Sequence, residues 1–433
     1  MNAIRPHIGI VGGGLAGLTA AYRLLQSGMV DVTVYESMPT CGGRIQSRTI
    51  RSEHVDFGGF LIYPWYTEGH KLFTDLHIDT CLVQTPLDDI LYILDENDHA
   101  ITEDAVAFPP KETVKIWTKS LLKILQKSPL SEPDLDRFNG KTISEYLRSA
   151  LDTQEHAGIY ETFFDTVSQG YCYGSVTETK AAFMMPIVRQ VKFHGDIRST
   201  SFFPQGSATV IDHLVKEITA LGGTIQCSTP ITKIDGHTLQ SHDHHFTHDT
   251  ILFAQNVSPD LYRTILPDLP DVDPACTYTQ FLTVAVALNA TPTFGTSKPW
   301  GAAFYAPDDS MPEQILSVIN ASSLYGSALA GCVVLNIVLR DRSPESITDE
   351  SISAIAHREL TRLFPTLIVE EILESVRWKN TMPIAQESFV QSVRDAQGKN
   401  GYYFAGDFLG APSIETAIAT GSRAAERIIA DHS

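Results

Sequence analysis

The stretch that decides the fold lies at the start of the chain: His7-Ile-Gly-Ile-Val-Gly-Gly-Gly-Leu-Ala-Gly-Leu-Thr-Ala-Ala21. Residues 8–11 form a short apolar run, which is typical of a buried strand. Gly12, Gly14 and Gly17 follow at G-x-G-x-x-G spacing, and apolar residues then recur with a helical period. The first glycine allows a tight turn, the second lets the backbone approach a pyrophosphate, and the third lets helix and strand pack closely. This pattern predicts a dinucleotide held at a helix N-terminus.

A second predicted strand, over 30–35, ends at Glu36, about twenty residues past the glycines. An acid at this position accepts hydrogen bonds from both ribose hydroxyls of an adenosine and repels a 2'-phosphate. Near the other end of the chain stands Phe404-Ala-Gly-Asp-Phe408. A Gly-Asp pair so far from the first motif suggests one long cofactor held at both ends, which points to FAD.

Composition narrows the classes of partner. The 433 residues are enough for two domains, or for one domain inserted in another. A formal charge of -19 disfavours nucleic acid and broad attachment to anionic lipid, because both need clustered Lys and Arg. No apolar run reaches the length of a membrane span, although peripheral membrane contact stays open. Only seven residues precede the first predicted strand, over 8–11, so we expect no signal peptide and a cytoplasmic protein.

The six cysteines are scattered and have no C-x-x-C spacing, which predicts reduced thiols. The tract His242-Asp-His-His245, followed by His248, has a composition that can bind zinc. Because it lies between two strand-like runs, we expect a solvated polar loop there and no metal site. Composition does not predict the oligomeric state.

Segments of nucleotide-binding character occur at the start, middle and end of the chain. We therefore predict an α/β fold in which a Rossmann-like FAD-binding domain is interleaved with an α+β substrate domain of mixed sheet plus helices. The predicted FAD-binding domain comprises 1–85, 204–265 and 390–433, and the substrate domain, with a helical subdomain, comprises 86–203 and 266–389. Helices are predicted within 110–195, at 114–125 and 143–167, and over 210–220 and 351–363. Further strands are predicted over 224–227, 231–234, 249–254, 281–288 and 332–339.

Together these motifs resemble the flavin-containing amine oxidase superfamily, which also holds protoporphyrinogen oxidases and carotenoid-type desaturases. The resemblance covers nearly the whole chain. It rests on residues 9–36, Gly42-Gly43-Arg44, Asp56-Phe-Gly58-Gly59 and 403–427, with support from Phe203-Pro-Gln-Gly-Ser to Ile234.

The resemblance implies a role for each matching residue. Glu36 would bind the adenosine ribose, Arg44 would approach the phosphates or the flavin edge unless it is a surface arginine, and Asp407 would bind the ribityl chain. The helix starting near Ser413 and Ile414 would direct its positive end at the flavin pyrimidine edge, where the reduced ring gathers negative charge. The other implied cofactor contacts are Gly12, Gly14, Leu15, Ala16 and Gly17 at the pyrophosphate, Gly42 and Gly43 beside Arg44, Gly58 and Gly59 near the flavin ring, Gly406, and Ile231 near the adenine. Ile231 has a second interpretation, as a plain buried strand residue.

Two departures from the family pattern are informative. No cysteine follows Cys332, so a C-terminal cysteinyl-flavin link is impossible and we expect non-covalent FAD. Cys41 lies beside Gly42 but is expected to serve packing. Many amine oxidases place a lysine on a central strand of the substrate domain, and residues 277–286 contain none. Gln280 is the nearest polar substitute and a weak candidate near flavin N5; Lys298 and Lys379 are alternatives if the alignment shifts.

The missing lysine favours dehydrogenation of a small hydrophobic substrate, by hydride transfer to flavin N5 with reoxidation by oxygen or another acceptor. Aromatic side chains that could form the pocket wall, or simply a core, are Tyr63, Trp65, Tyr171, Tyr173, Phe202 and Trp300. Two other classes stay open: a FAD enzyme acting on amines or catalysing a flavin-dependent mutase reaction, and a flavin-free protein of the GDP-dissociation-inhibitor type that binds prenylated GTPases.

Overall fold

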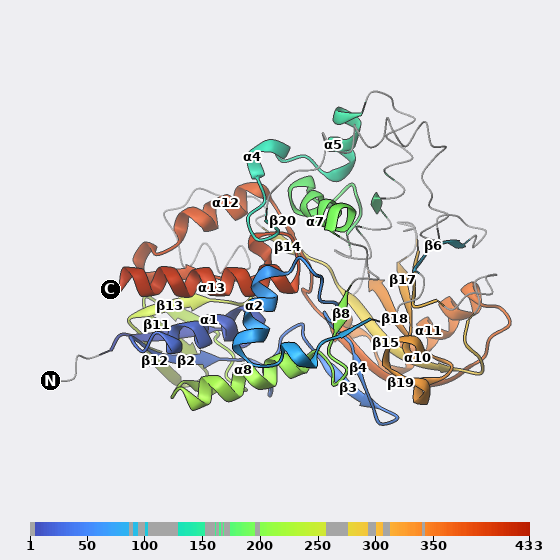
Figure 1. Cartoon of the computed structure of the whole chain (residues 1–433), viewed down its shortest axis with the longest axis horizontal. Helices are drawn as coiled ribbons and strands as arrows, with labels where there is room; N and C mark the ends of the chain where they lie inside the picture. Colours follow the sequence, from blue (N-terminus) through green and yellow to red (C-terminus); the bar gives the residue numbers. More distant parts are fainter. Residues whose placement is uncertain are drawn as a thin grey trace.

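Two large sheets organise the structure of this chain, a computed structural model (Figure 1). The structure describes residues 5–85, 90–93, 100–102, 129–151, 161, 164–165, 168, 174–194, 200–256, 276–292, 300–305, 312–339 and 343–433. The predicted helical stripe at 114–125 lies outside the described residues, as do Tyr171, Tyr173 and Lys298.

The first sheet has five strands in the order β21-β13-β1-β2-β9, and all neighbouring strands are parallel. Its strands come from the start, middle and end of the sequence, the three segments of the predicted FAD-binding domain, whose boundaries stay predictions. The strands are β1 (His7–Val11), β2 (Asp31–Tyr35), β9 (Thr224–Gln226), β13 (Thr250–Phe253) and β21 (Tyr402–Phe404). Helices α1 (Leu15–Gln26), α8 (Ala208–Ala220) and α13 (Ile414–Asp431) pack with this sheet.

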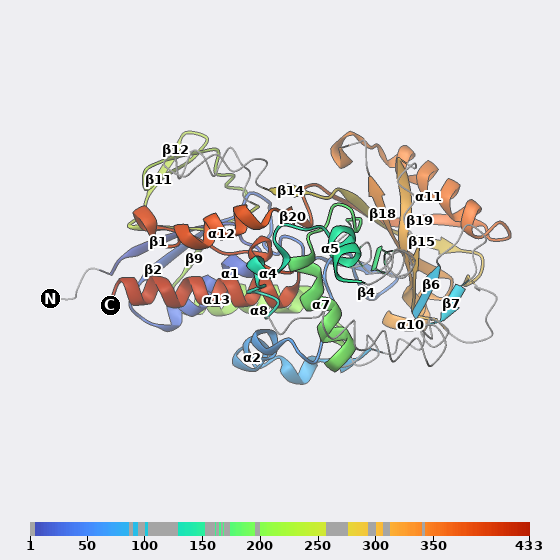
Figure 2. The ribbon, with the colours of Figure 1, turned by 90° about the horizontal axis from the view of Figure 1, so that it is seen from above.

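The second sheet has seven strands in the order β19-β15-β18-β17-β16-β6-β7. It is mixed, because β16 and β6 are parallel and the other neighbouring pairs are antiparallel. Its strands are β6 (Ile90–Ile93), β7 (Ala100–Thr102), β15 (Phe281–Leu288), β16 (Ala302–Tyr305), β17 (Glu313–Asn320), β18 (Cys332–Leu339) and β19 (Val369–Trp378). Helix α11 (Asp349–Leu363) packs on one face, visible in Figure 2, and the hairpin β3 (Ser47–Ile50)–β4 (Glu53–Asp56) packs on the other.

Smaller elements join the two sheets. The chain crosses between them in the short pairs β5 (Val83–Gln84)–β8 (Ser201–Phe202) and β14 (Cys276–Tyr278)–β20 (Pro383–Ala385). The remaining described α-helices are α2 (Thr67–Asp75), α4 (Leu135–Phe138), α5 (Ile143–Ala150), α7 (Ala181–His194), α10 (Ala321–Tyr325) and α12 (Glu387–Ala396).

Two predicted elements need correction. The helical stretch predicted over 143–167 is interrupted: α5 ends at Ala150, because Leu151 is extended (φ -103°, ψ 141°) and packs against the main core, whereas residues 161 and 164–165 are helical again. The strand predicted over 231–234 is displaced to β10 (Lys233–Asp235), where it pairs with β11 (Thr238–Ser241).

The solvated loop predicted for the histidine tract is confirmed at the turn and wrong beyond it. His242 occupies the turn of a hairpin, and His244 and His245 are exposed on strand β12 (His244–Thr247). His248 is buried, and its Nε2 lies 3.0 Å from the Tyr35 hydroxyl. Its ring fills the space above Gly9, where a Cβ would lie only 2.4 Å from His248 Cδ2. Within the described residues, no group of three His, Cys, Asp or Glu is placed to hold a metal ion.

His248 should make the protein less stable in mild acid. Burial, and then the neighbouring His7, lower the pKa of His248 to about 4. Below pH 6.5 His248 therefore binds a proton in the unfolded chain but stays neutral in the folded chain. The free energy of unfolding falls as the pH drops from about 6.5 towards 4. We expect a loss of about 1–2 kcal/mol between pH 7 and pH 5 in urea unfolding. His248→Gln should flatten this dependence, and an equal slope in that variant would contradict the assignment.

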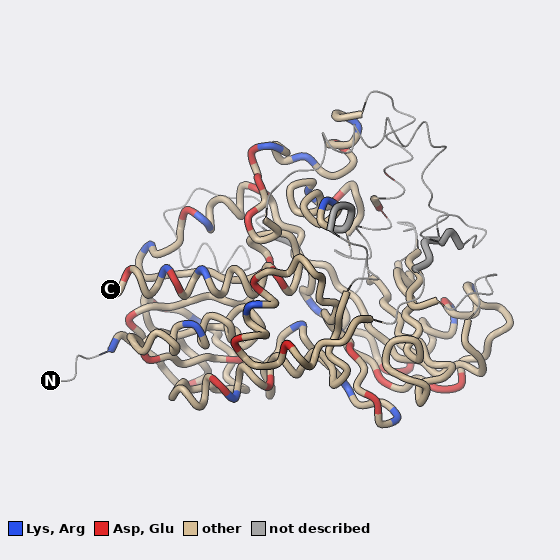
Figure 3. The backbone as a smooth tube through the Cα atoms, viewed as in Figure 1, with Lys and Arg blue, Asp and Glu red and all other residues tan. Residues whose placement is uncertain are grey.

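Acidic and basic residues are both scattered over the described chain (Figure 3). No helix in the described ranges is both long and apolar enough to cross a membrane.

Candidate cofactor site

The glycine loop, residues 12–14 between β1 and α1, forms one side of the site. Gly12 has φ +113°, which favours glycine, and a Cβ on Gly17 would lie 2.1 Å from the Gly12 carbonyl oxygen. A Cβ on Gly14 would meet only the Cα of Gly43, at 4.0 Å. Gly14 also begins α1 without a side-chain cap. Gly17 therefore serves packing, whereas Gly14 leaves the first N–H groups of α1 open to an anion.

Glu36 lies directly beside this loop at the end of β2. Its Oε2 accepts a hydrogen bond from Gly13 N at 2.8 Å, and its Oε1 accepts one from Met38 N at 2.8 Å. The carboxylate is 7% exposed and is thus held in one orientation at the edge of the loop. Oε1 also accepts a hydrogen bond from the Ser37 hydroxyl at 3.1 Å, whereas Oε2 accepts, among the described residues, only from Gly13 N. Oε2 therefore keeps an acceptor site for a ribose hydroxyl.

The Gly42-Gly43 segment covers the glycine loop. Gly42 N donates to the Gly13 carbonyl at 2.9 Å, and both residues have positive φ, +129° and +56°. A Cβ on Gly43 would lie 3.3 Å from the Cα of Gly14. The two backbones therefore approach closely because neither has a side chain at that point.

Arg44 and Asp407 form an ion pair, although 363 positions separate them. Arg44 Nη1 donates to Asp407 Oδ2 at 2.8 Å, and Nη2 donates to Oδ1. Nη1 also lies 3.6 Å from the Sδ of Met382. The structure thus brings together two residues that the resemblance assigned to one cofactor, and it adds Met382, which sequence reasoning missed.

Helix α13 starts beside this ion pair. The Ser413 hydroxyl caps it by accepting a hydrogen bond from Thr416 N at 3.0 Å, which confirms the predicted start at Ser413–Ile414. Gly406 has φ +151° and precedes Asp407. A Cβ on Gly421 would lie 2.3 Å from the Ala16 carbonyl oxygen, so α13 and α1 are in direct backbone contact.

Glu415 ties α13 to α2. Its carboxylate accepts hydrogen bonds from the Thr67 hydroxyl and from Glu68 N and Gly69 N, at 2.9–3.1 Å, at the start of α2. Burial raises the pKa of Glu415.

We expect Glu415→Gln to lower the free energy of unfolding by about 2 kcal/mol, because an amide NH₂ cannot accept from these N–H groups. The exposed Glu426, on the same helix, provides the control. Glu426→Gln should change stability by less than about 0.5 kcal/mol. Urea unfolding of the two variants measures both values, and equal stability would show that the cap contributes little.

Gly58 and Gly59, which the resemblance places near the flavin ring, contact the backbone of Arg44 in the structure. A Cβ on Gly58 would lie 1.9 Å from the Arg44 carbonyl oxygen, and Gly59 N donates to that oxygen at 3.1 Å. The small size of Gly58 is therefore already required by the backbone of Arg44, whereas a Cβ on Gly59 would make only ordinary contacts, at 3.6 Å.

Other predicted residues lie around this centre. Ile231 is half-buried in the coil before β10, while Thr229 N donates to the Glu36 carbonyl at 2.8 Å. Gln280 follows β14, and its Oε1 is buried without a hydrogen-bond partner in the described part of the chain. Its neighbour Thr279 N donates to the carbonyl of Met382, the residue that contacts Arg44. Lys379 instead pairs with Glu345 at the surface.

Cys41 packs against the glycine loop, as expected. Its Sγ would lie 2.8 Å from a Cβ on Gly13, and it is 3.9 Å from the Sγ of Cys227. Burial, reinforced by Cys227, raises the pKa of Cys41 to about 12, so the thiol stays protonated.

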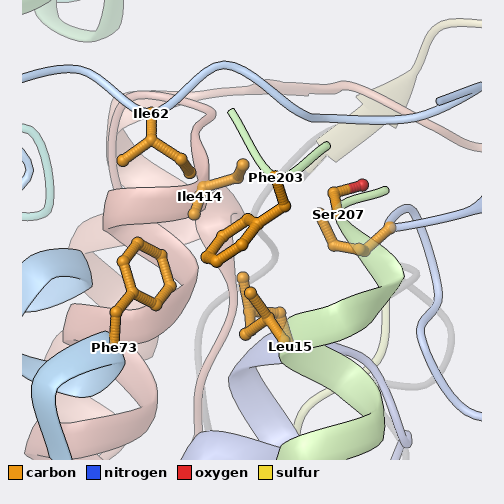
Figure 4. Close-up of a pocket in the computed structure, with 8 residues that line it drawn as sticks. Leu15, Ile62, Phe73, Phe203, Ser207 and Ile414 are labelled. Atoms are coloured by element: carbon orange, nitrogen blue, oxygen red, sulfur yellow. The ribbon is translucent and has the colours of Figure 1, made fainter. Parts of the chain in front are cut away.

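Two apolar pockets adjoin the start of α13. Figure 4 shows the first, where Leu15, Ile414, Phe73 and Phe203 point toward one another. Phe73 and Phe203 are in edge contact, with ring centroids 5.3 Å apart. The second pocket is lined by Tyr63, Trp65, Tyr66, Leu130, Ile187, Pro412 and Ser413.

The predicted wall aromatics divide into two groups. Tyr63 and Trp65 line the second pocket, with ring centroids 4.4 Å apart. Trp300 is instead buried in the core of the second sheet and donates to the Pro292 carbonyl at 2.7 Å. Phe202 packs in a separate small cluster with Tyr325. These two side chains line neither pocket and pack in other clusters.

The residues present fit FAD. A helix N-terminus without a side-chain cap, two facing glycines, a fixed carboxylate and an arginine converge within one site. When bound, FAD supplies the hydride-accepting chemistry, and Glu36, Arg44, Asp407 and the start of α13 would hold it.

Fold and site together define a dinucleotide-binding α/β protein. A family model for flavin containing amine oxidoreductases matches residues 15–429. The chain belongs to this family, its cofactor is FAD and its class is oxidoreductase.

Individual relatives are distant or matched over short segments. A tryptophan 2-monooxygenase from Pseudomonas savastanoi is 49% identical over 62 residues, which are 14% of this chain and 11% of that protein. A solved protoporphyrinogen oxidase-like structure from Exiguobacterium sp. 255-15 is 18% identical with a TM-score of 0.75, covering 99% of this chain and all of that one. A CLA-producing fatty acid isomerase from P. acnes is 16% identical with a TM-score of 0.73, covering 97% and 98%. These likenesses confirm the predicted fold class.

Proposed function

We propose that this protein dehydrogenates an apolar small molecule with non-covalent FAD. The observation that carries the proposal is the lining of the pocket beside Ser413, which consists of three aromatic residues, two of them tyrosines, together with two aliphatic side chains, a proline and a serine. Such a wall binds a largely apolar surface, and the described residues that line it include no carboxylate, imidazole or thiol. The chemistry is therefore left to the flavin, and the protein's part is to orient the substrate and exclude water.

Non-covalent binding follows from the cysteines. None lies after Cys332, and the Cys41 thiol beside the glycine loop is protonated and packed against Cys227. A protonated, buried thiol is a poor nucleophile. Precipitation of the protein should therefore release all of its flavin.

Gln280 would contribute a hydrogen-bond acceptor close to the cofactor. The buried, unpaired Oε1 supports this role, since a buried acceptor without a donor is costly unless a ligand supplies one. Gln280 would stand where amine oxidases of the family carry lysine, and this substitution supports dehydrogenation over amine oxidation.

Anaerobic mixing tests the proposal. The purified holoprotein is exposed to porphyrinogens, polyenes and simple amines while the visible absorbance of flavin is followed. We expect bleaching by an apolar porphyrinogen or polyene and none by amines. Bleaching by a simple amine would establish the amine oxidase alternative, and a colourless protein that takes up no FAD would support the flavin-free alternative. A polyene rearranged without bleaching would instead identify an isomerase.

A further inference from the structure

Three buried polar side chains form a row across the second sheet, and the row lies between apolar residues of β15 and β18. Thr283 on β15 is in register with Asn336 on β18, and Asn336 is in register with Ser317 on β17. Their exposed fractions are 2%, 9% and 3%. Polar groups this deeply buried need hydrogen-bond partners.

The hydrogen bonds of this row have one direction. Trp378 Nε1 can only donate, and it donates to the Thr283 hydroxyl at 2.9 Å. Thr283 donates to Asn336 Oδ1, and Asn336 Nδ2 donates to the Ser317 hydroxyl, both at 2.9 Å. The row thus ends in donors: the Ser317 hydroxyl proton and the second N–H of Asn336 meet no acceptor among the described residues.

A β-bulge places Ser317 in this row. The register of β17 with β18 shifts between Ile315 and Ser317, so that one extra residue is accommodated. Ile315 and Val318 both belong to the core under α11. A regular strand would put Ser317 on the same side as Ile315, whereas the bulge turns it to the opposite face. Bulges that re-aim a side chain are common beside active sites.

That opposite face adjoins the cofactor site. Its apolar residues, among them Phe281 and Val334, pack against Phe57, which immediately precedes Gly58 and Gly59. Phe281 itself follows Gln280. At the other end of the row, Ser317 is in register with Phe304 on β16. Phe304 packs against the largest hydrophobic cluster, which includes the residues of the first sheet.

We propose that the Ser317–Asn336 end of this row binds a neutral oxygen of the substrate, a carbonyl, ester or hydroxyl oxygen on an apolar skeleton. This inference rests on the proposed function and narrows its substrate class. The Ser317 hydroxyl and the Asn336 amide offer donors to a ligand, so an ammonium group, which only donates, is disfavoured. An ionised carboxylate would need a cation, and the described residues on this face in and beside the row include no Lys or Arg. Glu374, the carboxylate in the adjacent row, lies on β19, three strands from Ser317.

Four probes on one skeleton test the inference: benzylacetone, its hydrocarbon parent butylbenzene, phenylbutyrate and phenylbutylamine. Binding to the holoprotein is measured by equilibrium dialysis, which requires no turnover. We expect benzylacetone to bind about 5-fold more tightly than butylbenzene, the contribution of one neutral hydrogen bond. Phenylbutyrate and phenylbutylamine should bind more weakly than the ketone.

Ser317→Ala should abolish the preference for the ketone, and Thr283→Val, which interrupts the row, should reduce it. The matched control is Ser375→Ala on β19, whose register partner Val284 belongs to the core under α11, on the other face. A purely structural Ser317 would change the melting temperature but not the ketone preference. The inference fails if ketone and hydrocarbon bind equally, if phenylbutyrate binds best, or if Ser317→Ala keeps the preference. Failure of the proposed function would instead appear as absent bleaching, whatever the binding preference.

Discussion

Replacing Gly14 with alanine is expected to weaken FAD binding at least 100-fold, about 3 kcal/mol, while leaving the apoprotein as stable as the wild type. The backbone of Gly14 (φ -78°, ψ 179°) is open to any residue, and the new Cβ would meet nothing closer than 4.0 Å. The methyl group would, however, stand at the N-terminus of α1, beside the uncapped N–H groups. A pyrophosphate must approach the backbone closely there to bind these groups.

Gly17→Ala is the matched control, since the same methyl group is added three residues later. Its Cβ would lie 2.1 Å from a backbone oxygen that cannot move without breaking the turn. We expect a loss of at least about 3 kcal/mol of folding stability and little soluble protein. Urea unfolding of the apoproteins and titration with FAD, followed by flavin fluorescence, separate the two effects. Wild-type affinity in Gly14→Ala would show that the phosphates bind elsewhere.

The sequence predicts best those elements whose cause is local. Strands β15 and β18 have the predicted bounds, 281–288 and 332–339, because strands buried on both faces are continuous apolar runs. The start of α13 at Ser413 follows from its capping side chain. The glycine spacing likewise predicts the turn between β1 and α1, since only glycine tolerates the close contact at Gly17.

The missed features depend on contacts between distant residues. No local signal shows that His248 fills the space left by Gly9, and its polar surroundings favour a loop. The bulge in β17 breaks the alternation of residues 313–320, so the strand has no clear period. Tyr66 and Met382 join the site only through the packing of α2 and β20, and nothing in their immediate sequence marks them.

Arg44→Met is expected to lower the free energy of unfolding by about 3 kcal/mol and to weaken FAD binding at the same time. The substitution leaves the Asp407 carboxylate, whose side chain is only 7% exposed, without its cation. Removing one partner of a buried pair costs more than the pair itself contributes, because the remaining charge is not solvated. The Arg44 side chain is 31% exposed, so we expect the loss of unfolding free energy to lie at the lower end of the range for buried ion pairs.

The double variant Arg44→Met with Asp407→Asn separates stability from binding. With both charges gone, no unpaired charge is buried, and stability should return to within about 1 kcal/mol of the wild type. FAD affinity should stay at least about 100-fold reduced, because neither the cation for the phosphates nor the carboxylate for the ribityl hydroxyls is present. Recovery of affinity together with stability would mean that the pair only holds the fold. Continued loss of affinity in a stable protein would assign both residues to the cofactor, since folding alone does not need the charges.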